Sequence, residues 1–230
     1  MRPADEVIGD LRALADPSRL PGMSRVGINV ERALGVSIPA CRKLARQHRG
    51  DHQLALALWA SEIHEARILA SMIDDSEIVD RVQMEAWVVE FDSWDLCDQV
   101  CGNLFDRTSI AMDAARDWVE RPEEFVKRAG FTLIAERAHR DHDDDDASYI
   151  AWLPIIREGA LDERNYVKKA VNWALRQIGK RNEALRLAAI GEAERLVTME
   201  STVARWIGRD ALRELRSDAV IARTRGVENA

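Results

Sequence analysis

Residues 165–181 read NYVKKAVNWALRQIGKR, and this stretch predicts an amphipathic helix with two distinct faces. One face is apolar, repeats at i, i+4, i+7 and i+11, and consists of Val167, Val171, Ala174 and Ile178. The other face has the same spacing and consists of Lys169, Trp173, Arg176 and Lys180. The stretch contains no acidic residue. Trp173 shares its face with three cations, so its ring is expected to point away from the core.

An internal repeat surrounds this helix. The segment YVKKAVNWALR (166–176) is similar to FVKRAGFTLIA (125–135). Four tryptophans recur at spacings of 28, 31 and 34 residues, each in the first helix of an expected helical pair: Trp59, Trp87, Trp118 and Trp152. The second helices are expected to begin near His64, Trp94, Phe125 and Tyr166. A two-helix repeat of roughly 30–40 residues is typical of HEAT-like solenoids, whose second helices line the concave side. The recurrent tryptophans are then core residues.

The rest of the chain has the same helical period and no strand alternation. Helices are expected at 53–63, 64–73, 77–91, 93–108, 109–120, 122–139, 147–160, 165–181, 183–197 and 202–216. We therefore predict an all-α fold, a HEAT-like helical-repeat solenoid with a concave basic groove. Residues 1–217 are expected to form a single domain with an N-terminal cap helix at about 3–15, a loop at 16–29 and an acidic loop insertion at 139–147. Residues 218–230 are expected to form a C-terminal tail.

Composition supports helices, since only 12 Gly and 6 Pro occur in 230 residues, of which 47% are hydrophobic. The net charge of −7 and the pI near 5.4 would by themselves argue against nucleic-acid binding. The charges are unevenly distributed, however. Cations dominate 18–49 and 164–181, whereas acids concentrate in 74–98 and 143–146. The chain therefore has basic segments despite its negative total.

The compartment can be inferred from cysteines and apolar runs. Three Cys, an odd number, do not suggest a disulfide framework. No signal-peptide core is present at the N-terminus, and no apolar run approaches the ~20 residues that cross a bilayer. We expect a cytoplasmic, soluble monomer with no membrane contact.

The basic face of 165–181 suggests a ligand. Lys169, Arg176 and Lys180 could bind phosphates while Trp173 meets a sugar or base, although a solvated basic face is the alternative. Arg128 occupies the repeat position of Lys169 and is expected to face the same groove. Trp94 and Asp98 are four residues apart and share one helical face. For this pair the alternative is a core Trp with a surface Asp.

Metal and cofactor motifs are weak. Cys97 and Cys101 are spaced i, i+4 without an accompanying His or second Cys pair, so they are expected to be small core thiols. The aspartates of 143–146 are consecutive rather than spaced as ligands, which favours a solvated loop over a cation site. No phosphate-binding glycine loop or hydrolase motif occurs. We expect neither metal nor cofactor.

Three segments together resemble the DNA alkylation repair (AlkD-like) HEAT-repeat DNA glycosylase family. They are Trp-Asp-x-x-Asp at 94–98, FVKRAGF around Arg128, and KKAVNWALRQIGKRN at 168–182, the most specific of the three. The resemblance extends from about residue 20 to 215. It implies a HEAT-like superhelix that cradles double-stranded DNA and releases purines alkylated at N3 or N7. It also implies that Trp94 and Trp173 match the family's two groove tryptophans. Asp98 matches its aspartate and Arg128 its arginine.

The implied chemistry is reasonable for these residue types. An alkylated purine carries a positive charge and departs without a general acid, leaving an oxocarbenium-like sugar. Asp98 would stabilise that cation and position the attacking water. The indoles of Trp94 and Trp173 would face the electron-poor sugar, and Arg128 would hold a flanking phosphate. Two alternatives stay open: a non-catalytic DNA-structure binder on the same scaffold, and a protein-binding HEAT adaptor. The adaptor would need an apolar or acidic inner face, which the lysine stripe does not provide.

Overall fold

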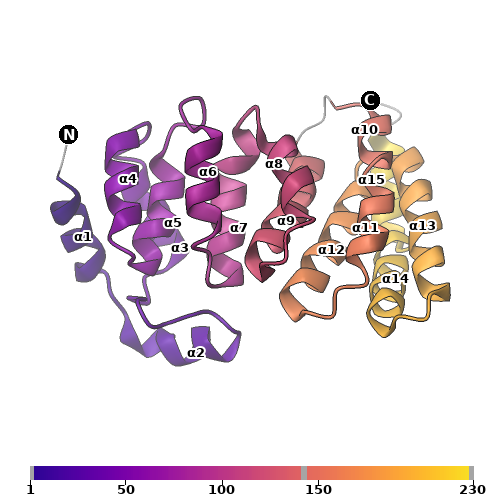
Figure 1. The fold of residues 1–230 in the computed structure, drawn as a ribbon, viewed down its shortest axis with the longest axis horizontal. Coiled ribbons are helices and arrows are strands. Elements are labelled where there is room, and N and C mark those ends of the chain that lie inside the picture. The colour runs from indigo at the N-terminus through magenta and orange to yellow at the C-terminus, as the bar shows by residue number, and fades with distance from the viewer. Residues whose placement is uncertain (1–2, 141–143, 228–230) are drawn as a thin grey trace. The chain divides into compact units, whose positions relative to one another are not determined.

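The computed structural model describes residues 3–140 and 144–227, and these residues form helices with no strand among them (Figure 1). The all-α prediction is therefore confirmed. The chain forms two compact units, Met1–Ala111 and Met112–Ala230, each with its own internal contacts. The single repeat domain expected over 1–217 stays a prediction. No helix in the described ranges is long and apolar enough to span a membrane.

The first unit contains helical pairs whose cores hold the recurrent tryptophans. Its elements are α1 (Ala4–Ala13), η1 (Pro17–Arg19), α2 (Leu20–Arg25), α3 (Ile38–Ala45), α4 (His52–Ala60), α5 (His64–Ile73), α6 (Arg81–Val88), α7 (Trp94–Asn103) and η2 (Phe105–Arg107). Helix α5 packs against α4, α3 and α7. Trp59 and Trp87 are buried and stack in parallel, with ring centroids 4.0 Å apart. The prediction that these two tryptophans are core residues is confirmed.

A connecting segment, residues 16–36, was expected to begin as a loop, but it contains η1 and α2. Helix α2 lies at the lower ends of the longer helices of this unit (Figure 1). The segment is tied down by Glu65, a buried carboxylate on α5 that accepts hydrogen bonds from the backbone N–H groups of Leu34, Gly35 and Val36 at 2.8, 2.7 and 3.1 Å. Gly35 has φ +79°, and a Cβ there would lie 2.1 Å from the Asp16 carbonyl oxygen, so this position requires glycine.

The second unit continues the pairing of helices. Its elements are α8 (Ala111–Trp118), α9 (Glu124–Arg140), α10 (Asp146–Ile150), α11 (Leu153–Gly159), α12 (Asn165–Ile178), α13 (Glu183–Thr198), α14 (Thr202–Leu215) and α15 (Asp218–Val227). The first residue of α8, Ala111, is the last residue of the first unit. Helix α12 packs against α9 on one side and α14 on the other. Trp118 and Trp152 are buried, which confirms the core prediction for the other two recurrent tryptophans.

Some helix boundaries differ from expectation for local reasons. The helix expected at 147–160 is broken into α10 and α11, because Pro154 has no N–H to bond the Ile150 carbonyl. The segment assigned to a C-terminal tail contains α15, which packs against α13 and α14. Of the acidic insertion at 139–147, residues 141–143 lie outside the described residues. Asp144 pairs with Arg137 at 2.8 Å, and Asp145 caps α10 by accepting from the Ser148 N–H.

Candidate functional site

The residues singled out from the sequence are divided between the two units. Trp94 and Asp98 lie on α7 in the first unit. Arg128 lies on α9, and the predicted basic face lies on α12, both in the second unit. Each set is described within its own unit.

Trp94 and Asp98 occupy the first two turns of α7, one turn apart, and both side chains are half-buried. The indole Nε1 of Trp94 donates a hydrogen bond to the Val26 carbonyl oxygen at 3.0 Å. Trp94 is thus not a core residue, in contrast to Trp59 on α4 and Trp87 on α6. The segment that follows α2 holds this indole at the start of α7, where sequence reasoning had placed only a loop.

The start of α7 is fixed by a polar network around Asp95. One carboxylate oxygen of Asp95 lies 2.9 Å from His64 Nε2, and the other accepts from the Ser93 hydroxyl at 2.9 Å. His64 is buried. Burial by itself would lower the pKa of His64, but the Asp95 hydrogen bond and the charges of Asp95, Glu65 and Asp92 together raise it above its ordinary value of 6.5. In its protonated form, His64 therefore pairs with Asp95 and helps to position the helix that carries Trp94 and Asp98.

This network predicts a pH dependence of stability. A histidine whose pKa is higher in the folded state contributes stability that is complete below its unfolded value of 6.5. That contribution is lost as the pH rises through the folded-state pKa. We expect the difference in urea-unfolding free energy between wild type and His64→Gln to be largest at about pH 6 and to shrink on raising the pH. A difference that does not change with pH would contradict the assigned role of the imidazolium.

The second unit displays the two faces predicted for α12. The apolar stripe is fully buried at Val167, Val171, Ala174 and Ile178, as expected. On the other face, Trp173 is half-buried and Lys169 is exposed. Within the described residues, Lys169 has no ion-pair partner.

The two cations in the C-terminal half of this face already share an acidic partner, which spacing in the sequence could not reveal. Glu214 on α14 pairs with Arg176, and its Oε1 lies 2.7 Å from Lys180 Nζ. Burial opposes ionisation of Glu214, but these two cations outweigh it and lower its pKa. The concave basic groove therefore stays a prediction, and two of its cations have an intramolecular acidic partner.

Arg128 has a different environment from the one expected. Its side chain is buried on α9, 5% exposed, and Nη1 donates to the Tyr166 carbonyl oxygen at 2.6 Å. Tyr166 lies in the first turn of α12. Arg128 therefore links α9 to α12, and phosphate binding by this residue stays a prediction.

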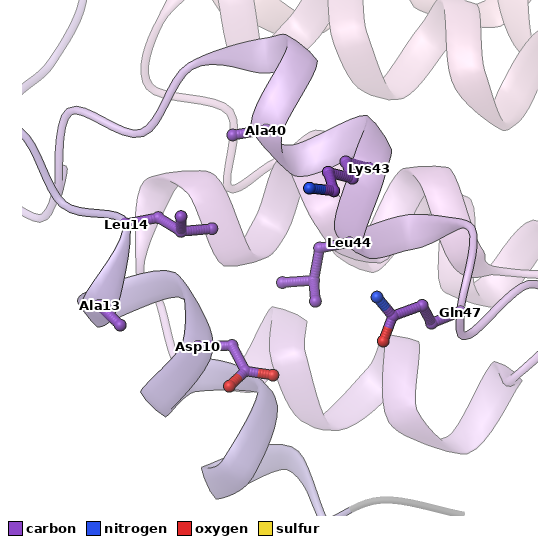
Figure 2. Close-up of a pocket in the computed structure, with 7 residues that line it drawn as sticks. All are labelled: Asp10, Ala13, Leu14, Ala40, Lys43, Leu44 and Gln47. Atoms are coloured by element: carbon purple, nitrogen blue, oxygen red, sulfur yellow. The ribbon is translucent and has the colours of Figure 1, made fainter.

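A pocket in the first unit does not involve the predicted site residues. A pocket of about 340 Å³ lies between α1 and α3, with Leu14 and Leu44 forming apolar walls beside Asp10 and Lys43 (Figure 2). None of the predicted site residues lines it.

The cysteines are buried. Cys97 and Cys101 are core thiols, as expected. Burial together with the Glu65 charge raises the pKa of the Cys41 thiol to about 12. In the described ranges, no three His, Cys, Asp or Glu side chains gather into a potential metal site.

The fold belongs to a known structural class. One solved structure matches with a TM-score of 0.77 and 19% identity, covering 92% of this chain and 95% of that chain. It is described as a new family of proteins related to the HEAT-like repeat DNA glycosylases, with affinity for branched DNA structures. A second structure, of an engineered protein, matches with a TM-score of 0.45 and 10% identity over 94% of this chain and 99% of that chain. The all-helical fold is therefore structurally similar to the HEAT-like repeat glycosylase relatives.

The family is shown by the sequence. A family model described as DNA alkylation repair enzyme matches residues 7–215, and the chain belongs to this family. No curated protein sequence matches the chain.

Proposed function

We propose that the protein is a DNA glycosylase that hydrolyses the N-glycosidic bond of N3- or N7-alkylated purines in double-stranded DNA, acting as a cytoplasmic monomer. The observation that carries the proposal is the pairing of Asp98 with Trp94, one helical turn apart and half-buried rather than buried, in a chain of the DNA alkylation repair family. A partly accessible carboxylate beside a partly accessible indole suits a developing sugar cation.

The reaction makes modest demands on the protein. The bond between C1′ and the purine nitrogen breaks, and both electrons leave with the base and cancel its positive charge. A water positioned by Asp98 then adds to C1′ and releases its proton to solvent. Asp98 contributes negative charge near C1′, where positive charge develops in the transition state. A general acid is unnecessary because the departing base is already cationic.

DNA binding is assigned to the face of α12. Lys169 is exposed without an ion-pair partner among the described residues, so its charge is available to a phosphate. Trp173, half-buried on the same face, would contact the sugar. Arg176 and Lys180 would add their charge to DNA by exchanging Glu214 for phosphate. Arg128 supports α12 through the Tyr166 carbonyl and would act as a positioning residue.

The proposal is tested by measuring base release from duplex DNA treated with a methylating agent. We expect free N7-methylguanine or N3-methyladenine to appear in proportion to enzyme and time. Duplex carrying no alkylated base should release nothing, since a neutral purine is a poor leaving group. Tight duplex binding without release of either base would overturn the glycosylase proposal.

Removing cations from α12 and removing the acid that pairs with them should change duplex binding in opposite directions. Lys169→Ala combined with Lys180→Ala should weaken duplex binding on the order of tenfold and reduce the slope of log K against log salt by about 1 to 2. Lys169 should account for most of this loss, because Lys180 is compensated by Glu214. Glu214→Gln should instead tighten binding a few-fold and steepen the slope. Duplex-binding titrations at several salt concentrations measure both.

The matched control is Arg195→Ala, since Arg195 is an exposed cation on α13 in the same unit. This variant should leave the salt slope unchanged. An unchanged slope in the double lysine variant would instead move the DNA path away from α12.

A second candidate function is non-catalytic binding of DNA structures. It is favoured by the similar solved structure that is described as having affinity for branched DNA. Under this alternative, Trp94 and Asp98 would contact DNA without excision. Base release separates the two functions directly.

A further inference from the structure

An exposed indole on α14 has no role in the proposed chemistry. The Trp206 side chain is 43% exposed, whereas the four recurrent tryptophans of the repeats are at most 5% exposed. The Lys168 ammonium lies 5.4 Å from the centroid of the Trp206 ring. A large apolar ring left in water, with a cation against it, suggests a surface that is covered by a ligand.

The register of the repeats places Trp206 on the same face as Lys169. The buried residues of α12 and α14 correspond at an offset of 37: Val167 with Ala204, Ala170 with Ile207, Val171 with Gly208, Ala174 with Ala211, and Ile178 with Leu215. Trp206 therefore takes the position that Lys169 occupies one repeat earlier. At an offset of 41, the same position on α9 is Arg128.

Close helix crossings support this register. A Cβ on Gly130 of α9 would lie 2.8 Å from the backbone nitrogen of Val119, the residue that follows α8. A Cβ on Gly208 of α14 would lie 2.5 Å from the Ala193 carbonyl of α13. The two glycines are equivalent at the offsets of 41 and 37, so each lets the second helix of a pair cross the first helix at the same point. The faces of α9, α12 and α14 can therefore be compared residue by residue.

The charges around Trp206 favour an anion. Lys168, Lys169 and Arg209 are cations on α12 and α14, and neither Lys169 nor Arg209 has an ion-pair partner within the described residues. The acids on the facing sides of these helices are already engaged. Asp210 accepts from Asn172 and pairs with Arg213, and Glu214 pairs with Arg176 and Lys180.

A ligand that offers both a planar ring and regular negative charge is single-stranded nucleic acid. In a duplex the base faces are covered by their neighbours, so they cannot stack on a protein side chain except at an end or a branch. An unpaired base has a free face, and stacking on an aromatic side chain with cations on the flanking phosphates is the usual recognition of single strands.

We propose that Trp206, with Lys168, Lys169 and Arg209, stacks an unpaired nucleobase of a single-stranded segment that adjoins the bound duplex. This inference rests on the DNA-binding part of the proposed function and does not depend on base excision. It assigns α14 a role in selecting DNA with unpaired bases, separate from the roles of Asp98 and Trp94.

The test compares one duplex in two forms, blunt-ended and with a single-stranded thymidine extension. Wild type should bind the extended form about tenfold more tightly than the blunt form. Trp206→Ala should abolish this preference and change blunt-duplex affinity by less than about twofold, while Trp206→Phe, which retains a ring, should keep most of it. Base release from blunt methylated duplex should be the same in wild type and Trp206→Ala, so that failure here is distinguishable from failure of the glycosylase proposal.

Leu187→Ala is the matched control, because Leu187 is also a large exposed apolar side chain in the same unit, 56% exposed on α13. It should leave both affinities unchanged. A second measurement uses fluorescence: oligothymidine should quench wild type more than Trp206→Phe. The proposal is overturned if Trp206→Ala retains the preference for the extended form, if it loses affinity equally for both forms, or if wild type shows no preference.

Discussion

Asp98→Asn is expected to reduce the rate of alkylpurine release by about 10²- to 10³-fold while leaving duplex affinity within about twofold. The substitution preserves the size of the side chain but removes its negative charge. That charge is worth most when the sugar becomes cationic, so the loss should fall on the single-turnover rate constant rather than on the dissociation constant. Single-turnover release and equilibrium binding, measured on the same methylated duplex, separate the two quantities.

The matched control for this variant is Glu77→Gln. Glu77 is an exposed carboxylate in the first unit and takes no part in the network at the start of α7. Its neutralisation changes the net charge by the same amount and should leave the release rate within about twofold. Wild-type release rates in Asp98→Asn would remove this carboxylate from the mechanism. Equal losses in both variants would indicate a general effect of charge.

Glu65→Ala is expected to destabilise the first unit by about 3 kcal/mol or more. The Glu65 carboxylate is 1% exposed and accepts hydrogen bonds from Leu34, Gly35 and Val36. Removing it leaves three backbone N–H groups without their acceptor in a partly buried segment, and each such group costs on the order of 1–3 kcal/mol if water cannot replace the partner. Urea unfolding, followed by circular dichroism, measures the change in unfolding free energy.

Glu62→Ala provides the comparison. Glu62 lies three residues earlier and pairs with Arg32, but the pair is exposed, with half of the Glu62 side chain open to solvent. Its loss should cost less than about 1 kcal/mol. The expected role of Glu65 is wrong if the two variants are equally stable. Because the segment after α2 also supplies the Val26 carbonyl to Trp94, Glu65→Ala should in addition slow base release.

Several elements of the fold could be predicted because they depend on neighbours within a few turns of helix. The apolar stripe of 165–181 and the four recurrent tryptophans indicated buried positions that are indeed buried. The break before α11 could also have been predicted, because Pro154 cannot donate a hydrogen bond to the Ile150 carbonyl. The helix was nevertheless expected to continue through this proline. Helix α2 is only six residues long with Pro21 and Gly22 in its first turn; it has little helical propensity of its own and was expected to be a loop.

The candidate site was less accessible to sequence reasoning. The positions of Trp94 and Asp98 on one helix, and of Lys169 and Trp173 on another, follow from 3.6-residue periodicity alone. Periodicity could not show that Arg128 is buried against Tyr166, because that contact joins different helices. Trp206 was overlooked because its significance appears only when buried residues of α12 and α14 are aligned.

The sequence by itself therefore determined most of the helices, the buried face of 165–181, the four recurrent core tryptophans and the family, because each depends on residue order and short-range spacing. Only the tertiary structure decided which charges are available. Glu214 lies 34 residues beyond Lys180 and pairs with it, and Glu65 lies about 30 residues beyond the N–H groups it binds. Such pairs form when helices distant in sequence pack together, and their energies depend on distances of a few ångströms and on burial, which residue order does not encode locally.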